Sequence, residues 1–387
     1  MQFSAFMPKI EFGDGKIGQI AAIAREYGRK ALLAVDPYLV ESGLAEDIRA
    51  KLKRGSIEAI INSDIQPNPD CYAVDRAGEI ARQEKCDLVI GVGGGSAIDY
   101  GKAVAVVATN PGESWRYTRR TDHEVLVPSG KTLPVIAVPT TAGTGSEATT
   151  YAVLNNSRLH EKSTIISALI LPRISIVDPG LMVSMPPQLT AYTGIDALAQ
   201  AIESFINLGA NPFNRMLALE AIRLIAEHLP MAVANGQNRT ARAKMAWAST
   251  LAGAAIGFVA TTLPHSMGQA VGGYKNAPHG ATLTACLVKV LEFSWVADPG
   301  LFSEISEALE PETRSLSVRA RAEMCPRLVE RLVADTGTKV SFGDFGLTEA
   351  DIDRVTEIAF TGYGADINLH PRKATVEDVK RLYRACL

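Results

Sequence analysis

The stretch that decides the fold is CDLVIGVGGGSAID, residues 86–99. Its first half is a continuous apolar run, which is typical of a parallel strand buried on both faces. We expect a helix to follow, from Ser96 to about Thr109. A glycine-rich turn between strand and helix lets backbone N–H groups approach a pyrophosphate, and the helix N-terminus adds partial positive charge. The stretch therefore predicts an α/β domain with a nucleotide site, and a turn without a ligand is the alternative.

Apolar runs of the same kind flank this stretch. We expect further strands at 30–36, 56–62 and 133–139, with helical stretches between them. This alternation predicts a parallel, doubly wound sheet, in which ligands bind beyond the carboxyl ends of the strands. The last strand runs into PTTAGTGSE (139–147), a second loop rich in glycines and hydroxyls. Two such loops favour a nucleotide site, although Ser96 stands where GxGxxG has its third glycine.

Three charged side chains near these loops have two interpretations each. Asp36 ends the first strand, where a carboxylate can accept hydrogen bonds from a ribose and repel a 2′-phosphate, which favours NAD over NADP. Alternatively, Asp36 is a helix N-cap ahead of Pro37. Lys102 and Lys162 are either further nucleotide contacts or solvated surface lysines.

The pattern changes near residue 180, beyond which the chain is almost wholly helical in period. We therefore expect two domains, a dinucleotide-binding α/β domain at 1–180 and an all-α domain at 181–387. The clearest helical stretches are 187–206, 215–229, 241–260, 319–337 and 376–387.

Composition excludes several classes of protein. The chain has 387 residues, 47% of them hydrophobic, and a net charge of -3, which gives no electrostatic reason to expect nucleic acid or a membrane as partner. The N-terminus lacks the pattern of a secretory signal, and no uncharged apolar run has the length of a spanning helix. The five cysteines are scattered and form no CxxC, as expected of free thiols in a reducing compartment. We expect a cytoplasmic protein.

The helical half holds a candidate metal site. Asp196 and Gln200 are four residues apart, as are His265 and Gln269, so each pair shares one helix face. One carboxylate and two imidazoles, the third ligand being His279, form a plausible site for Zn²⁺ or Fe²⁺ with room for a substrate oxygen. The alternative is that these histidines are hydrogen-bonded core residues.

Taken together, these stretches resemble the iron-containing (group III) alcohol dehydrogenases, which have a dehydroquinate synthase-like fold. The resemblance spans essentially the whole chain, in family order. It implies an N-terminal NAD-binding α/β domain, a helical domain with a divalent metal (Fe or Zn), hydride transfer to or from a small alcohol or aldehyde, and a homodimer. The matching segments are PNP (67–69), GGGSAIDYGK (93–102), PTTAGTGSE (139–147), IVDPGL (176–181), TGIDAL (193–198), HSMGQAVGG (265–273) and APHG (277–280).

The resemblance also implies roles for individual residues. It places the catalytic positions on Asp196, His265, His279 and Gln269, and the metal positions on Asp196, Gln200, His265 and His279. The implied cofactor positions are Asp36, Asn68, Gly94, Gly95, Ser96, Asp99, Thr140, Thr141, Thr144 and Lys162.

Two glutamines depart from the family pattern, which has a histidine at each position. Gln200 replaces a metal ligand, so it either coordinates weakly through its amide oxygen or only hydrogen-bonds a metal-bound water. We expect the metal to remain on three ligands, and the loss of an imidazole favours Zn²⁺ over Fe²⁺. Gln269 replaces a histidine thought to help move the proton, and an amide cannot act as a general base. The proton must then leave through water, a ribose hydroxyl or another group.

Three other functions fit the same fold. One is a maleylacetate reductase-like oxidoreductase, and another is a lyase of the dehydroquinate synthase type. The third is a nucleotide-binding protein in which the two glutamines mark a lost metal site. PTTAGTGSE and the layout of the helical half favour the dehydrogenase.

Overall fold

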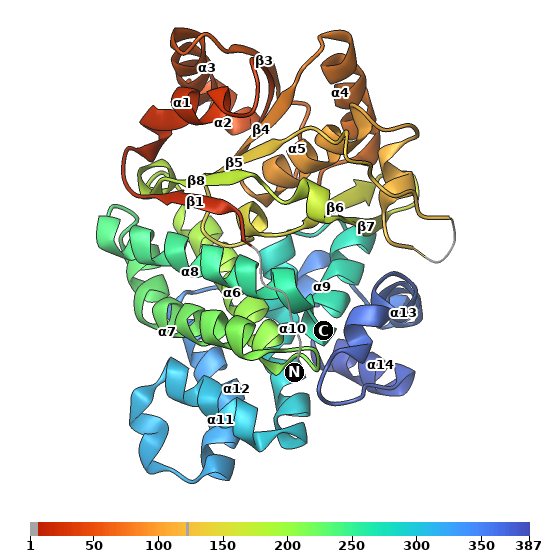
Figure 1. The fold of residues 1–387 in the computed structure, drawn as a ribbon. Coiled ribbons are helices and arrows are strands. Elements are labelled where there is room, and N and C mark those ends of the chain that lie inside the picture. Colours follow the sequence, from red (N-terminus) through yellow and green to blue (C-terminus); the bar gives the residue numbers. More distant parts are fainter. Residues whose placement is uncertain (1–6, 121–123) are drawn as a thin grey trace. The chain divides into compact units, whose positions relative to one another are not determined.

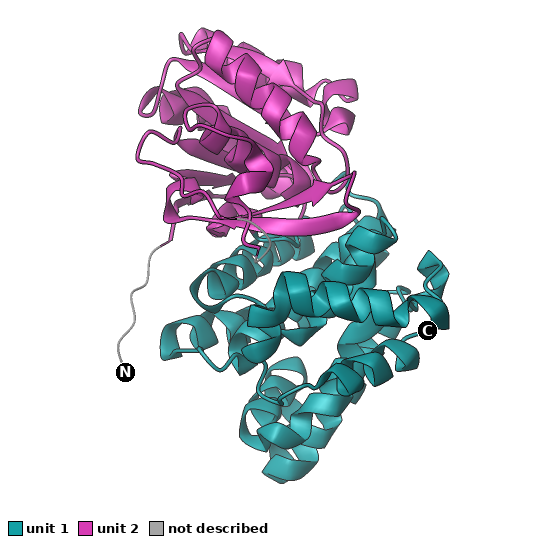
Figure 2. Cartoon of the chain, turned by 90° about the vertical axis from the view of Figure 1, so that its right-hand side faces the viewer, with its two compact units in different colours: residues 1–5, 142–145, 183–387 teal, residues 6–141, 146–182 magenta. Residues whose placement is uncertain are grey.

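A computed structural model describes residues 7–120 and 124–387 of the chain. The chain forms two compact units, which Figure 2 colours separately. Of the described residues, those within 7–141 and 146–182 form unit 2, and those within 142–145 and 183–387 form unit 1. The short segment Ala142–Gly145 of the second glycine-rich loop thus belongs to unit 1, whereas a division at residue 180 assigns it to the first domain.

Unit 2 is built on a six-stranded sheet in which all paired strands are parallel. The four expected strands are present. Every residue of β4 and β5 is buried, because helices cover both faces of the sheet. This confirms the predicted α/β class. In spatial order the strands are β1 (Lys9–Phe12), β8 (Ile174–Val177), β5 (Val135–Pro139), β4 (Leu88–Gly93), β2 (Lys30–Val35) and β3 (Glu58–Asn62).

Alternate residues of the central strands β2, β4 and β5 enter two separate cores. Leu32 packs in a core with α4 (Cys71–Gln83) and α5 (Gly95–Val107). Its neighbour Leu33 packs in a core with α1 (Ile20–Arg25) and α3 (Leu44–Arg54). Successive side chains of a strand point to opposite faces, so a strand that is apolar throughout requires this double covering. Figure 1 shows these helices around the sheet.

Four strands are additional to those expected from the sequence. β1 and β8 have only four residues each, too short for a clear pattern. β6 (Tyr151–Asn156) and β7 (Glu161–Ile166) form a separate antiparallel hairpin. Buried and partly exposed residues alternate along β6, as expected of a strand with one face toward the core.

Unit 1 is helical, as expected, and the five helical stretches predicted from the sequence are present. α6 begins and ends at the expected residues, and α9, α10, α11 and α13 are additional to the five predicted stretches. The helices are α6 (Pro187–Ile206), α7 (Pro212–Ala234), α8 (Arg239–Val259), α9 (Leu263–Tyr274), α10 (His279–Ser294), α11 (Pro299–Leu309), α12 (Val318–Asp335), α13 (Ile352–Asn368) and α14 (Val376–Ala385).

One helical segment of unit 1, His279–Ala297, has the length and apolar composition of a membrane span. Half of that segment is buried inside the protein, which is what a core helix of a folded domain also shows. α8 and α9 would meet the same test as a pair, but the chain bends by 101° between them. These properties concern length and composition only.

Candidate active site

The nucleotide-side candidates of unit 2 lie at the point where the strand order reverses. The chain leaves β2 toward β3 on one side, and β4 and β5 follow on the other side. Asp36 directly follows β2, and the glycine-rich turn follows β4, the neighbouring strand. In open parallel sheets, ligands bind outside the carboxyl ends of the strands at such a switch point. The topology therefore places Asp36 and the first glycine-rich turn at the position expected for a nucleotide.

Gly93 makes this turn possible. Its φ of 147° is a value that side-chain-bearing residues rarely adopt, and a Cβ there would lie 3.0 Å from the Cβ of Asp36. The next residue, Gly94, packs against Thr141, and the backbone N–H of Thr140 donates to the carbonyl of Gly93 at 2.9 Å. The two glycine-rich loops are thus joined at their start, and Gly93 packs closely against Asp36.

Asp36 also has the structural role that the sequence allowed. Its carboxylate caps α2 (Pro37–Glu41) by accepting the backbone N–H of Tyr38 at 3.0 Å. Two further cofactor candidates contact each other: Ser96 Oγ accepts a hydrogen bond from the backbone N–H of Asn68 at 3.4 Å. Asn68 has a φ of 64°, which asparagine tolerates better than most residues.

Lys102 is not a surface lysine, which was one of its two interpretations. It is fully buried, and its ammonium donates to Ser146, Thr149 and the carbonyl of Tyr151, with the Asp99 carboxylate 3.8 Å away. Burial lowers the pKa of Lys102 to about 8, against the charge of Asp99. A buried ammonium is tolerated only where several acceptors surround it, so Lys102 links α5 to residues 146–151.

Asp99 and Lys162 are buried as well. Asp99 accepts hydrogen bonds from Ser146 Oγ and from the N–H of Val153, at 2.9 Å for the latter. Burial raises its pKa, and Lys102 opposes that shift. Lys162 is 5% exposed, so the surface interpretation is wrong for this residue too, and burial lowers its pKa to about 8.

The metal-side candidates all belong to unit 1, where three of them converge. Asp196 lies in the middle of α6, His265 in the first turn of α9, and His279 at the first position of α10. Asp196 Oδ1 is 3.5 Å from Nε2 of His265 and 3.7 Å from Nε2 of His279. One ligand atom from each residue lies within 4.8 Å of the others. A carboxylate oxygen and two imidazole nitrogens at this spacing fit a divalent transition metal with an open coordination position.

Gln200 lies beside these three residues, with its amide nitrogen toward them. Nε2 donates to Asp196 Oδ1 at 3.0 Å and to the carbonyl of Thr144 at 3.1 Å. The opposite amide orientation would place an oxygen against two acceptors, so the hydrogen bonds fix which end faces Asp196. The amide oxygen of Gln200 is buried and meets no donor in the described part of the chain.

Gln269 is one helical turn beyond His265 in α9. It is 9% exposed, and among residues 7–120 and 124–387 no group donates to its buried amide oxygen. The other predicted site residues that lie in unit 1 are Asp196, Gln200, His265, His279 and Thr144.

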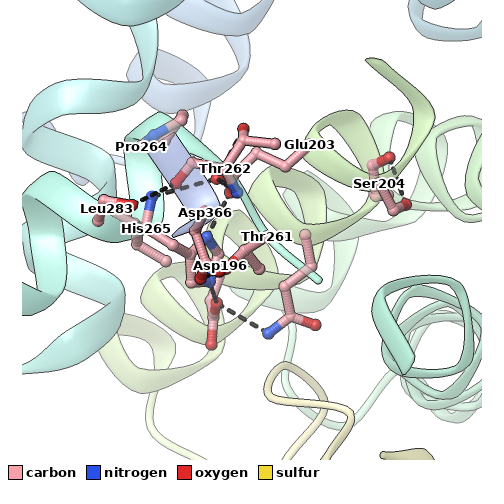
Figure 3. A network of polar contacts seen from close by, with 12 residues as sticks. Asp196, Glu203, Ser204, Thr261, Thr262, Pro264, His265, Leu283 and Asp366 are labelled. Atoms are coloured by element: carbon pink, nitrogen blue, oxygen red, sulfur yellow. Dashed lines mark hydrogen bonds and ion pairs between the residues drawn. The ribbon is translucent and has the colours of Figure 1, made fainter. Parts of the chain in front are cut away.

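The sequence-based search missed Glu203, which contacts His265. Glu203 is fully buried, and its Oε2 is hydrogen-bonded to Nδ1 of His265 (Figure 3). Burial by itself lowers the pKa of His265, but the charges of Glu203 and Asp196 outweigh it and raise the pKa to about 10. The available signal was spacing, since Glu203 is seven residues after Asp196 and therefore on the same face of α6.

Two family comparisons cover nearly the whole chain. Residues 8–179 match the family "Iron-containing alcohol dehydrogenase". Residues 190–387 match the C-terminal domain of the Fe-containing alcohol dehydrogenase family. The chain belongs to the iron-containing alcohol dehydrogenases. This confirms the family that the sequence motifs indicated, and with it the expectation of an oxidoreductase.

Individual relatives agree with the family assignment. The chain is 36% identical over 386 residues to a 1,3-propanediol dehydrogenase of Citrobacter freundii, covering 99% of this chain and 98% of that one. It is 35% identical to an NAD-dependent methanol dehydrogenase of Bacillus methanolicus, with 98% of each covered. An archaeal halo-thermophilic alcohol dehydrogenase from a Red Sea brine pool has the same fold, with a TM-score of 0.96 and 32% identity over 100% of this chain and 99% of that one. These matches give no support to the lyase or maleylacetate reductase alternatives over the dehydrogenase.

Proposed function

We propose that the protein is an NAD-dependent, metal-assisted alcohol dehydrogenase that interconverts a small alcohol and its aldehyde. The observation that carries this proposal is the convergence of Asp196 Oδ1 with the Nε2 atoms of His265 and His279. These are ligand atoms of the type that zinc and iron prefer, in a chain of a metal-containing dehydrogenase family.

Asp196, His265 and His279 would hold the cation. A bound divalent cation supplies Lewis acidity that lowers the pKa of an alcohol, and bound NAD supplies the hydride acceptor. The protein contributes position and charge. Asp196 and His265 are nearly fully buried, so they desolvate one side of the site, whereas the His279 side chain is 30% exposed and leaves an approach for substrate.

We propose that Zn²⁺ is favoured over Fe²⁺ in this chain. With the Gln200 nitrogen turned toward Asp196, the site offers three protein ligands and no fourth imidazole. Three protein ligands with an open position is the arrangement of catalytic zinc sites.

The nucleotide would bind to unit 2 at the carboxyl ends of β2, β4 and β5. Gly93 and Gly94 carry no side chain there, and the backbone N–H groups at the start of α5 could receive a pyrophosphate. The Asp36 carboxylate, which sits next to Gly93, disfavours a 2′-phosphate and therefore NADP. Gln269 cannot act as a general base, so the alcohol proton would leave through water, a ribose hydroxyl or another group.

The test is elemental analysis of the purified protein, followed by an assay of NADH consumption with a panel of small aldehydes. We expect one equivalent of zinc or iron per chain and turnover that a chelator abolishes. His265→Ala and His279→Ala should each bind the metal much more weakly and lose activity with it. Wild-type metal content and turnover in both variants would contradict the proposal.

A further inference from the structure

The face of α6 that carries Asp196 also carries two residues that contact the proposed metal ligands. Asp196, Gln200 and Glu203 follow one another at positions i, i+4 and i+7, which lie on one side of a helix. Gln200 hydrogen-bonds Asp196, and Glu203 hydrogen-bonds His265. Glu203 is the more unusual of the two, because a fully buried carboxylate is costly unless it is well paired.

Both oxygens of Glu203 are occupied by donors of α9 and the residue before it. Oε1 accepts the backbone N–H of Thr262 at 2.9 Å and that of His265 at 3.1 Å. Thr262 is the N-cap of α9, but its own side chain makes no capping bond to the helix. Glu203 therefore satisfies free N–H groups at the start of α9 from another helix, where the helix dipole favours a negative charge.

The other oxygen of Glu203 fixes the imidazole of His265. A carboxylate oxygen only accepts hydrogen bonds, so the bond between Oε2 and Nδ1 places a proton on Nδ1. Nε2 then offers its lone pair once a cation replaces the proton on that nitrogen. This Nε2 is the atom that lies 3.5 Å from Asp196 Oδ1. Figure 3 shows Glu203, Thr262, His265 and Asp196 in this network. Both oxygens of Glu203 already accept hydrogen bonds, and Glu203 is not among the grouped ligand atoms.

We propose that Glu203 is the positioning residue of the metal site: it selects the His265 tautomer and ring orientation that present Nε2 to the cation. This proposal rests on the proposed function only in taking His265 as a ligand. Carboxylates that hold a metal-ligating histidine in this way change metal affinity by roughly 10- to 100-fold when they are mutated.

The test is the transfer of Zn²⁺ from the holoprotein to a chromophoric chelator, which measures metal affinity without any turnover. We expect Glu203→Gln to weaken Zn²⁺ binding by about 10- to 100-fold. The matched control is Ser204→Ala on the same helix, whose buried hydroxyl donates back to the carbonyl of Ala201 at 3.0 Å. Ser204→Ala should hold Zn²⁺ as the wild type does. NAD affinity should be unchanged in both variants.

A double-mutant cycle separates positioning from a general loss of structure. If Glu203 acts through His265, adding Glu203→Gln to His265→Ala should lower Zn²⁺ affinity by less than about twofold. An equal loss in both backgrounds, or no loss in the single variant, would overturn the proposal. If Glu203→Gln does not fold, Glu203→Asp keeps the charge but draws the carboxylate away from Nδ1, so it too should weaken Zn²⁺ binding. Wild-type affinity of Glu203→Asp would equally reject the assignment. Failure of the proposed function would appear instead as a wild-type protein that holds Zn²⁺ but turns over no alcohol.

Discussion

The contact of Gly253 with Gly145 allows a sharp prediction, because two backbones meet there without side chains. A Cβ at Gly253 would lie 2.3 Å from the carbonyl oxygen of Gly145 and 2.5 Å from its Cα. Ordinary contacts begin near 3.4 Å, so α8 and the segment 142–145 must separate by about 1 Å in Gly253→Ala. Overpacking of this kind costs about 1–3 kcal/mol. The neighbouring Thr144 carbonyl moves with the segment and loses its bond to Gln200, so metal affinity should fall as well.

The assay is urea unfolding followed by the helical circular dichroism signal, together with Zn²⁺ transfer to a chelator. Gly362→Ala in α13 is the matched control, because nothing lies within 4 Å of a Cβ added there. Gly362 directly precedes a break in α13 at Tyr363, so that variant should be at least as stable as the wild type and should gain at most about 1 kcal/mol. If Gly253→Ala were as stable as the wild type and bound Zn²⁺ equally well, the close contact between α8 and 142–145 would be refuted.

Three further predictions concern single side chains. Gln200→His places an imidazole beside Asp196, so Zn²⁺ affinity measured by chelator competition should rise by about tenfold or more, and an unchanged affinity would show that position 200 cannot reach the cation. Asp36→Ala should raise the ratio of NADP to NAD turnover and cost about 1 kcal/mol through the lost cap of α2, both of which kinetics and unfolding measure. Burial lowers the pKa of Lys102 from 10.5 to about 8, so between pH 8 and 10.5 the unfolded chain binds more protons than the folded one. The free energy of unfolding of the wild type should therefore rise relative to that of Lys102→Met over this pH range. Parallel curves of unfolding free energy against pH would contradict this.

Much of the fold could be predicted from the sequence, because its strongest patterns are local. The buried strand at 86–92 and the glycine-rich turn after it indicated a parallel sheet, and β4 and α5 are found there. The helix predicted at 187–206 agrees with α6 at both ends, since a long apolar periodicity bounded by prolines and an asparagine leaves little freedom. The short strands β1 and β8 escaped prediction, because four residues carry too little pattern.

The candidate metal site was only partly readable. Asp196, His265 and His279 were selected by residue type and by resemblance, and in the structure their ligand atoms converge. Glu203 was missed because a glutamate on a helix is usually a solvated residue, and its seven-residue spacing from Asp196 was the available sign that it shares a helix face with that residue. Only the packing of α9 against α6 shows that it caps one helix and holds the histidine of that helix.

By itself the sequence determined the family, the α/β and helical halves, and the identity of the donor atoms, since these depend on residue type and short-range periodicity. The tertiary structure decided what each polar side chain faces. It turned the Gln200 nitrogen toward Asp196, buried Lys102 and Lys162, and set Glu203 behind His265. The physical reason is that hydrogen-bond partners of buried groups come from distant parts of the chain, so only packing can say which donor meets which acceptor.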